Sequence, residues 1–518
     1  MSARRRRQAG WRPHHWTRLR RAVQYAALSV FTALFVWSRR GGWPSTVVNS
    51  PLRLDPLAML AHLLASRTLL AGSALALLTV GLTLSLGRVW CGWLCPAGTL
   101  LDVFSLRSGH ERRDAPPESW RNAKYGLLLT VLATALLSNL TLMVLDPLTI
   151  LFRTLSASVW PAVDQIVSAS EALLYRLPTL RPGISAFDAL VRPKILPPEP
   201  AFYRFTWLYA GVFAGLVSLN LLAPRFWCRY LCPLGGLLGL LSKTSIVRRK
   251  VNARCTQCHA CARVCPTGTI QADRQYASDP GECTFCLECL SVCPQNAVEF
   301  LPHFSVATWN PYDPSRRQAL LALGTAIAGV GLFRSDQPAR REHPRLIRPP
   351  GARENGLLSK CIRCGECSRA CPTSVIQPAI AEAGLEGLWT PVLVPRLGYC
   401  DYSCAACGQV CPVQAIPPLD LQQKRQQVLG QAYIDQSRCL SWANNQPCIV
   451  CEEMCPVPNK AIELEQVEVQ GPNGGTITLQ RPHVVRTRCI GCGTCEFKCP
   501  VNGEAAIRVY VPHNGRLG

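Results

Sequence analysis

The sequence predicts a membrane α-helical domain combined with α+β domains rich in cysteine. Three observations support this fold class. Four long apolar stretches lie before residue 230, 28 cysteines recur at regular spacings, and basic residues flank the apolar stretches of a chain whose net charge is +23. Because a single core stops growing at roughly 250 to 300 residues, 518 residues should form several domains.

The four apolar stretches have the length expected of transmembrane helices, since about 20 apolar residues cross a hydrocarbon core of roughly 30 Å. The predicted spans are 22–37, 68–86, 125–145 and 205–223. Buried helices of a soluble core are the alternative, but the flanking arginine and tryptophan residues favour a bilayer. Eight arginines precede the first span and four follow it before the second, so the positive-inside rule places the N-terminus in the cytoplasm.

Residues 87–102 and 224–239 form an internal repeat that agrees at nine of sixteen positions, around the pattern R-x-W-C-x-x-L-C-P. The first copy carries Cys91 and Cys95, and the second carries Cys228 and Cys232. A spacing of four residues places two thiols on one helical face. The four thiols form either a redox or metal site at the membrane surface or, as reduced cysteines, pack a helix end.

The other cysteines form six sets of four. Four sets follow C-x2-C-x2-C-x3-C-P, one opens with a three-residue gap and one with an eight-residue gap. The sets are Cys255, Cys258, Cys261 and Cys265; Cys283, Cys286, Cys289 and Cys293; Cys361, Cys364, Cys367 and Cys371; Cys400, Cys404, Cys407 and Cys411; Cys439, Cys448, Cys451 and Cys455; and Cys489, Cys492, Cys495 and Cys499. A loop of closely spaced thiolates wraps three corners of an iron–sulfur cube. The sequence therefore predicts six 4Fe–4S clusters.

The fourth cysteine of such a set ligates the neighbouring cluster. We therefore expect Cys293 to join the first three cysteines of the first set, and Cys265 to join those of the second. Zinc usually takes two C-x2-C pairs separated by a longer loop, and the cytoplasm disfavours disulfides. The residues 255–259 also match the C-x-x-C-H haem signature, but they lie inside a complete cluster motif, so His259 is interpreted as a loop residue.

A second arginine-led apolar segment lies past the middle of the chain. Arg316 and Arg317 precede a 15-residue apolar run, 319–333, which is typical of an export signal. A twin-arginine signal retained as a fifth span would leave the first two clusters cytoplasmic and the last four periplasmic, at a bacterial inner membrane. A linker helix, with all clusters on one side, is the alternative.

These features predict five regions. They are a basic cytoplasmic tail (1–21), a four-span domain with the cysteine repeat (22–254), a cytoplasmic two-cluster ferredoxin domain (255–300), a twin-arginine-like span with a basic linker (301–356) and a four-cluster ferredoxin-like domain (357–518).

With these motifs in place, residues 1–300 resemble the NapH family of membrane ferredoxin-type proteins and residues 315–518 resemble the NapG/MauM family. The chain resembles a fusion of the two. The resemblance implies electron flow from membrane quinol, through the clusters, to a periplasmic reductase of the nitrate-reductase type or a cytochrome acceptor. It also implies that the last four sets pair first with fourth and second with third. In that pairing Cys499 joins Cys361, Cys364 and Cys367; Cys371 joins Cys489, Cys492 and Cys495; Cys455 joins Cys400, Cys404 and Cys407; and Cys411 joins Cys439, Cys448 and Cys451.

The predicted function is therefore membrane-bound electron transfer. The sequence leaves open whether the protein also oxidises quinol as a dehydrogenase or only passes electrons on. An assembly factor for a respiratory oxidase or reductase is the alternative from another class. The sequence contains no nucleophile motif, phosphate-binding loop or dinucleotide fingerprint, so no catalytic residue is assigned. A nucleic-acid partner is excluded because the basic residues flank spans. His62, Asn139 and Asn220 could hydrogen-bond a quinol, although such asparagines more often join helices.

Overall fold

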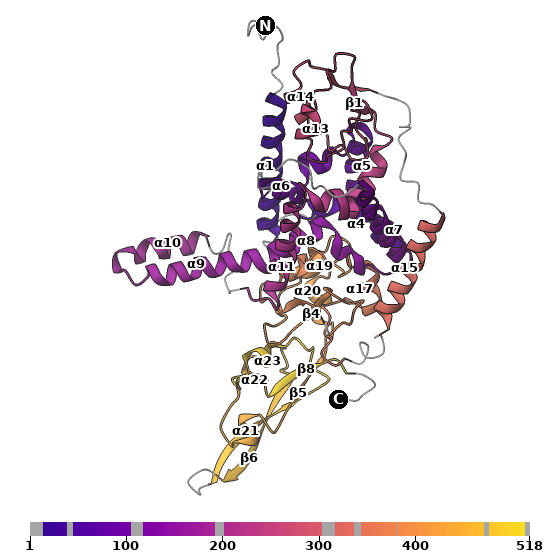
Figure 1. Cartoon of the computed structure of the whole chain (residues 1–518). Coiled ribbons are helices and arrows are strands. Elements are labelled where there is room, and N and C mark those ends of the chain that lie inside the picture. Colours follow the sequence, from indigo (N-terminus) through magenta and orange to yellow (C-terminus); the bar gives the residue numbers. More distant parts are fainter. Residues whose placement is uncertain are drawn as a thin grey trace.

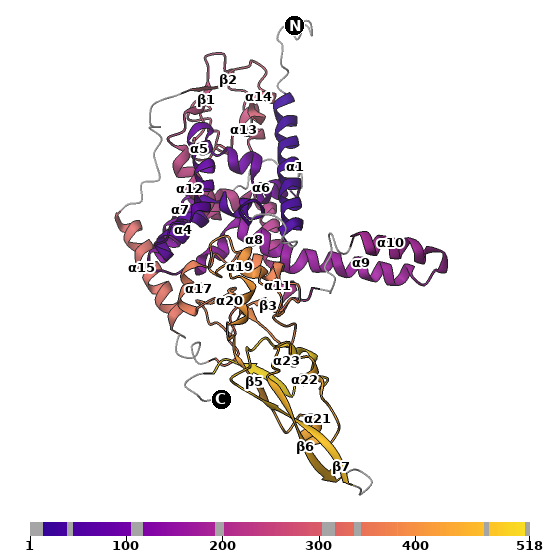
Figure 2. The ribbon, with the colours of Figure 1, turned by 180° about the vertical axis from the view of Figure 1, so that it is seen from behind.

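The computed structural model describes residues 14–38, 45–104, 118–191, 201–302, 316–335, 343–380, 382–470 and 476–512. The molecule is elongated (Figure 1). A helical region lies in the middle, a first cysteine-rich module (247–302) lies at one end, and a second module (343–512) extends from the other. Seen from behind, a helical arm projects sideways from the middle region (Figure 2).

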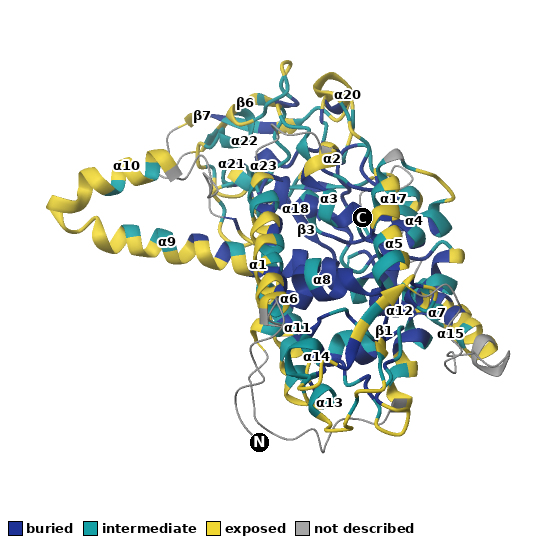
Figure 3. Cartoon of the chain, turned by 90° about the horizontal axis from the view of Figure 1, so that it is seen from above, coloured by how far each residue is buried: buried dark blue, intermediate teal, exposed yellow. Residues whose placement is uncertain are grey.

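The helical region contains short helices joined by tight turns. Its α-helices are α1 (His14–Trp37), α2 (Ser45–Val48), α3 (Ser50–Arg53), α4 (Pro56–Ser66), α5 (Leu75–Leu86), α6 (Pro96–Val103), α7 (Asn122–Leu136), α8 (Pro147–Thr154), α9 (Trp160–Leu174), α10 (Arg181–Val191), α11 (Thr206–Ser218) and α12 (Pro233–Ser242). The π-helical turns η4 (Trp90–Leu94), η8 (Leu155–Val159) and η11 (Trp227–Leu231) precede α6, α9 and α12. Helices α9 and α10 form the projecting arm and are largely exposed (Figure 3).

Four helices of this region begin with proline directly after an N-cap residue. Asp55 and Asp146 cap α4 and α8, and Cys95 and Cys232 occupy the same position before α6 and α12. Proline suits the first helical position because its fixed φ is helical and its missing N–H leaves no donor unsatisfied. The side chain of Asp55 accepts hydrogen bonds from two backbone amides and that of Asp146 from one, so the carboxylates satisfy donors that the helix leaves free.

The prediction of a membrane α-helical fold with four spans and a fifth twin-arginine-like span is wrong. Among the described ranges, no helix has both the length and the apolar character needed to cross a membrane. Helices α5, α7 and α11 contain 12, 15 and 13 residues, so they are about 18 to 23 Å long against a hydrocarbon core of roughly 30 Å. Helix α7 ends where Ser138 adopts a left-handed φ of 59°.

The two longer helices contain arginines. Arg18, Arg20 and Arg21 lie within α1, and α15 (Arg316–Arg334) begins with the two arginines of the expected export signal and ends on a third. The predicted inner-membrane localisation, with two clusters inside and four outside, required these spans and is also wrong. The twin-arginine interpretation of Arg316 and Arg317 is not supported, and most of the predicted basic tail (1–21) lies outside the described residues.

The first module is framed by one antiparallel pair of strands. Strand β1 (Val247–Val251) pairs with β2 (Val298–Pro302). Along the chain, α13 (Ala260–Val264) and α14 (Glu288–Val292) lie between these two strands. This is the α+β character expected of a two-cluster ferredoxin.

The described part of the second module contains three antiparallel strand pairs, one of which is a long hairpin. Its strand pairs are β3 (Ile376–Pro378) with β4 (Pro391–Leu393), β5 (Gln431–Ile434) with β8 (Ile507–Tyr510), and β6 (Ile462–Gln470) with β7 (Thr476–Val484). Its helices are α17 (Glu354–Lys360), α18 (Glu366–Ala370), α19 (Ala406–Gln409), α20 (Leu421–Arg425), α21 (Leu440–Ala443), α22 (Val450–Glu453) and α23 (Thr494–Lys498).

The second module packs directly on the helical region. Asn49 donates to the carbonyl of Val410 (2.5 Å), and Tyr203 donates to the carbonyl of Ser368 (3.1 Å). One hydrophobic core contains Leu57 and Leu234 of the helical region together with Cys364 of the second module. Helix α8, all of whose residues are buried, lies at the centre of this arrangement (Figure 3).

Candidate iron–sulfur sites

The four sets with C-x2-C-x2-C spacing share one backbone conformation. The residue before the second cysteine and the residue after it both have positive φ, as in Gln257 and His259 (53° and 58°) and in Gly491 and Gly493 (69° and 83°). Phe285 and Leu287, and Arg363 and Gly365, repeat the pattern in the other two sets. These left-handed residues turn the chain around each middle cysteine, so three thiols can face one cavity.

The first module contains two sites with exchanged fourth cysteines, as the spacing predicts. Site 1 is lined by Cys255, Cys258, Cys261 and Cys293. Site 2 is lined by Cys283, Cys286, Cys289 and Cys265. The side chain of His259 lines site 1 and lies against Tyr276, whose hydroxyl is 3.0 Å from His259 Nε2. Its place inside a complete set of four thiols agrees with its interpretation as a loop residue.

Arg249 lies between sites 1 and 2 and lines both cavities. Its Nη1 donates to the Tyr276 carbonyl at 2.6 Å. Burial disfavours the guanidinium charge, but the neighbouring thiols of Cys289 and Cys261 favour it, and the pKa of Arg249 is raised as a result. A fixed cation therefore faces both sets of thiolates.

The cysteine pairing implied by family resemblance for the second module is wrong. Site 3 is lined by Cys361, Cys364, Cys367 and Cys411. Site 5 is lined by Cys489, Cys492, Cys495 and Cys455, and site 6 by Cys439, Cys448, Cys451 and Cys499. Neighbouring sets therefore exchange cysteines, the first with the second and the third with the fourth. The physical reason is local: each fourth cysteine follows a one-turn helix, such as α18 or α23, whose partner helix belongs to the adjacent set.

Site 4 consists of Cys400, Cys404 and Cys407 with Cys371. Burial raises the pKa of the Cys407 thiol, and the thiols of Cys400, Cys371 and Cys404 raise it further. The backbone amide of Cys400 donates to the carbonyl of Cys492 at 2.8 Å, so site 4 directly adjoins site 5. Sites 3 to 6 thus follow one another without a gap.

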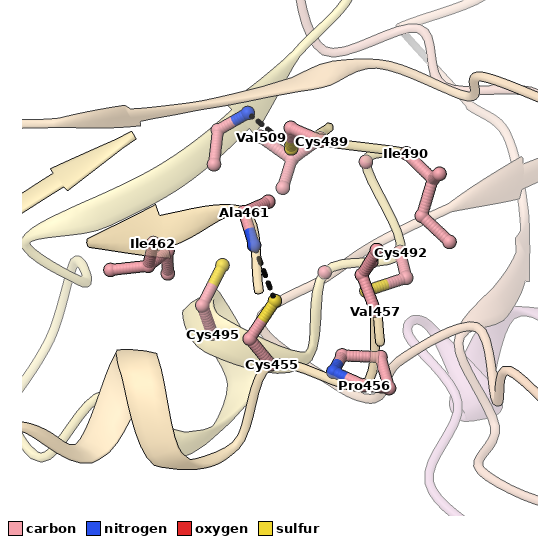
Figure 4. A pocket seen from close by; sticks show the side chains of 13 residues that line it. Cys455, Pro456, Val457, Ala461, Ile462, Cys489, Ile490, Cys492, Cys495 and Val509 are labelled. Carbon is pink, nitrogen blue, oxygen red and sulfur yellow. Dashed lines mark hydrogen bonds between the residues drawn. The ribbon is translucent and has the colours of Figure 1, made fainter. Parts of the chain in front are cut away.

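The sites have the donors that cluster ligation requires. Figure 4 shows the thiols of site 5 facing a shared cavity, with the Ala461 amide donating to Cys455 Sγ at 3.4 Å. Cys489 Sγ accepts from the Ala432 amide at 3.3 Å, and Cys293 Sγ of site 1 accepts from Ala297 at 3.2 Å. Backbone amides aimed at sulfur stabilise thiolate charge and tune cluster potential. Within the described part of the chain, no three or more His, Cys, Asp or Glu side chains converge on a point suited to a single metal ion.

The three candidate quinol contacts have different partners within the chain. Asn139 donates to Glu386 at 3.3 Å and Asn220 to the Leu101 carbonyl at 3.0 Å, so both tie segments together. His62 is buried in α4 beside Lys360, and burial followed by that charge lowers its pKa to about 4. Its neighbour Val413 lines site 3.

The structure also brings the four cysteines of the repeat together. It places two arginines beside them that the sequence did not identify as site residues. Burial, then Cys91 and Cys228, raises the pKa of the Cys95 thiol. Arg88 and Arg225, which lie three positions before the first cysteine of each repeat, are buried beside these thiols. The two arginines occupy the same position of the repeat, and this equivalence could have identified them from the sequence as residues of the thiol site.

Families of iron–sulfur domains match several parts of the chain. A family described as a 4Fe–4S binding domain matches residues 68–114 and 205–254, and a 4Fe–4S dicluster domain matches residues 253–297. A further 4Fe–4S binding domain matches residues 358–377 and 482–503. No solved structure matches the chain.

Several curated relatives are ferredoxin-type proteins. The methylamine utilization ferredoxin-type protein MauM of Methylorubrum extorquens is 36% identical over 218 residues, 40% of this chain and 94% of the relative. The ferredoxin-type protein NapG of Escherichia coli is 35% identical over 189 residues, 36% of this chain and 79% of the relative. MauN of Methylorubrum extorquens is 29% identical over 275 residues, 49% of this chain and 76% of the relative. The fusion with a NapH-type protein stays a prediction, whereas the MauM and NapG matches establish that the chain belongs to the MauM/NapG family of ferredoxin-type 4Fe–4S proteins.

Proposed function

We propose that the chain carries single electrons between a quinol donor and a periplasmic reductase or cytochrome, using six 4Fe–4S clusters bound at sites 1 to 6. The observation that carries this proposal is the unbroken series of sites 3 to 6, in which neighbours share exchanged cysteines or a direct hydrogen bond. Clusters of this type accept and release one electron at a time. The protein holds the sites close together and surrounds them with buried side chains.

Sites 1, 2, 3, 5 and 6 suit clusters because four thiols line one cavity in each, and at sites 1 and 5 backbone amides donate to sulfur atoms. The charged side chains near them would set the potentials. Arg249 faces sites 1 and 2, and Arg153 lines site 3. A nearby cation favours the reduced, more negative state of a cluster.

The donor can be tested with the purified full chain under anaerobic conditions. A soluble quinol analogue is added, and electron paramagnetic resonance of frozen samples measures reduced clusters. We expect signals of reduced 4Fe–4S clusters, which disappear when a periplasmic reductase or cytochrome is added as acceptor. Clusters that dithionite reduces but quinol leaves oxidised would overturn the proposed donor. If, in addition, loss of the gene blocked maturation of a partner enzyme, the assembly-factor alternative would replace electron transfer.

A further inference from the structure

The two copies of the cysteine repeat fold alike. In each, the first cysteine lies in a π-helical turn, η4 or η11, and the second is the N-cap of a proline-led helix, α6 or α12. The backbone angles of Cys95 (φ −67°, ψ 116°) and Cys232 (φ −68°, ψ 112°) are nearly the same. The repeat in sequence is therefore a repeat in structure.

The copies hold each other through reciprocal arginine contacts. Arg225 of the second copy donates to the carbonyl of Cys91 in the first at 3.2 Å, and Arg88 of the first donates to the carbonyl of Cys228 in the second at 3.4 Å. Both arginines are 1% exposed. Equivalent residues thus make equivalent contacts across the interface, as expected of two related halves around an approximate two-fold axis.

This arrangement gathers four thiols into one buried group. Cys91, Cys95 and Cys232 belong to the same hydrophobic core, and Trp227, beside Cys228, packs against it. Cys232 Sγ accepts from the Gly235 amide at 3.1 Å, the same amide-to-sulfur contact that occurs at sites 1 and 5. The guanidinium groups of Arg88 and Arg225 lie close enough to act on the Cys228 thiol, so two cations offset thiolate charge there.

Close packing explains why both copies have glycine three positions after the second cysteine. A Cβ at Gly98 would lie 2.9 Å from the Cys91 carbonyl oxygen. A Cβ at Gly235 would lie 2.8 Å from Arg88 Nη2 and 3.3 Å from the Cys228 carbonyl oxygen. An added methyl group at either glycine would therefore collide with groups that take part in the contacts between the two copies.

The thiol group directly adjoins site 2. Trp93 donates to the Phe285 carbonyl at 2.9 Å, within the cysteine loop of that site. A Cβ on Gly92 would lie 2.1 Å from the Thr284 carbonyl oxygen. Arg88 also reaches this loop, donating to the Gly281 carbonyl at 3.1 Å and to Glu282 at 3.3 Å.

On its other side, the thiol group is linked to site 3 by the buried helix α8. Asp146, the N-cap of α8, lies close enough to raise the pKa of the Cys232 thiol, after burial and the other thiols. Arg153, near the end of α8, lines site 3. Helix α8 has eight residues and is about 12 Å long, and it runs from the neighbourhood of Cys232 to site 3.

We propose that Cys91, Cys95, Cys228 and Cys232 ligate a seventh iron–sulfur cluster, which relays electrons between site 2 and site 3. Four cysteine thiolates suffice for a 2Fe–2S or a 4Fe–4S cluster. Each transfer moves one electron from one cluster to the next; no bond is formed or broken and no proton is transferred. Neither of the segments 68–114 and 205–254 that match a 4Fe–4S binding domain contains more than two cysteines, so only their joint fold completes the ligand set. This relay rests on the proposed electron-transfer function.

The ligand set is tested on the full chain purified anaerobically, by iron analysis and Mössbauer spectroscopy. The double variant Cys95→Ser and Cys232→Ser removes one thiol from each copy. We expect it to lose about two or four iron atoms per chain relative to the unmodified protein, while the signals of sites 1 to 6 remain. Cys258→Ser, which removes a ligand of site 1, is the matched control and should change the signals of site 1 alone.

Relay is tested by flash photoreduction followed by freeze-quench paramagnetic resonance. We expect the double variant to slow electron transfer from sites 1 and 2 to sites 3 to 6 by more than tenfold. If the unmodified protein contains only the iron needed for sites 1 to 6, it has no seventh cluster and the proposal is overturned. This result stands even if the double variant fails to fold. Normal transfer in the double variant would overturn the relay. Because neither test uses quinol, failure of quinol as donor would leave this inference intact.

Discussion

Glu282 provides a stringent test of how the first module is attached, because it is a buried carboxylate that joins two cations of the helical region. Lys124 Nζ lies 2.5 and 2.6 Å from its two oxygens, and Arg88 Nη1 lies 3.3 Å away. The exposed fractions of the three side chains are 0% for Lys124, 1% for Arg88 and 3% for Glu282. Burial disfavours the carboxylate, but Lys124 and Arg88 outweigh it and lower the pKa of Glu282.

Replacing Glu282 by alanine leaves two buried cations without their anion. Removing one partner of a buried ion pair costs about 3 to 5 kcal/mol. We expect this loss in the free energy of unfolding, measured from urea transitions of the holoprotein by tryptophan fluorescence at pH 7.5. The double variant Glu282→Ala and Lys124→Met also removes one orphaned charge and should recover part of the loss.

Acid should produce the same effect more gradually. A carboxylate whose pKa is lowered in the folded state contributes stability above its ordinary pKa of 4.5, and this stability is lost as the pH falls through the lowered value. A change of less than about 1 kcal/mol in the unfolding free energy of Glu282→Ala, or a further loss of stability on adding Lys124→Met, would exclude this role for the buried ion pair.

Three further substitutions test other contacts. Arg249→Met removes the cation between sites 1 and 2 and should lower the reduction potentials of both clusters by some tens of millivolts in a potentiometric titration. The guanidinium of Arg248 binds the Ser245 carbonyl instead, so Arg248→Met should leave both potentials unchanged. Gly92→Ala should cost more than about 2 kcal/mol in unfolding free energy and release iron from site 2, whereas Gly126→Ala, with open space at its Cβ, should be neutral or stabilising. Asp146→Ala removes the side chain that accepts from the Thr149 amide at the start of α8, and should lower the unfolding free energy by about 1 kcal/mol in a urea titration. An unchanged unfolding free energy would mean that this cap does not stabilise α8.

The cysteine sites were predictable to the extent that they depend on local chain geometry. The spacing in residues 255–293 predicted the exchange of Cys265 and Cys293, because three thiols and a following Cys-Pro turn occupy fixed positions along a short loop. In the second module the exchange partner depends on which sets pack together, and spacing does not contain this information. Resemblance supplied the wrong partners there, and the packing of α18 on α19 and of α22 on α23 decides the pairing.

Apolar character was a weaker guide than cysteine spacing. The stretches 68–86 and 125–145 are apolar along their length, but the first contains a 3₁₀ turn before α5 and the second breaks at Ser138 and Asn139. A window of hydropathy averages over such breaks, which is why four spans were expected where the structure has shorter helices. The contacts of Arg88 and Arg225 join residues more than 130 positions apart, and only the fold reveals them.

The proposed electron transfer requires the cysteine sites to hold redox-active iron–sulfur clusters that exchange electrons with one another. The decisive measurement is a potentiometric titration of the anaerobically purified full chain, followed by electron paramagnetic resonance. We expect one-electron reduction at every site, with spin coupling between clusters that share exchanged cysteines. A protein that contains zinc in place of iron, or whose iron stays silent across the whole range of potentials, would contradict it.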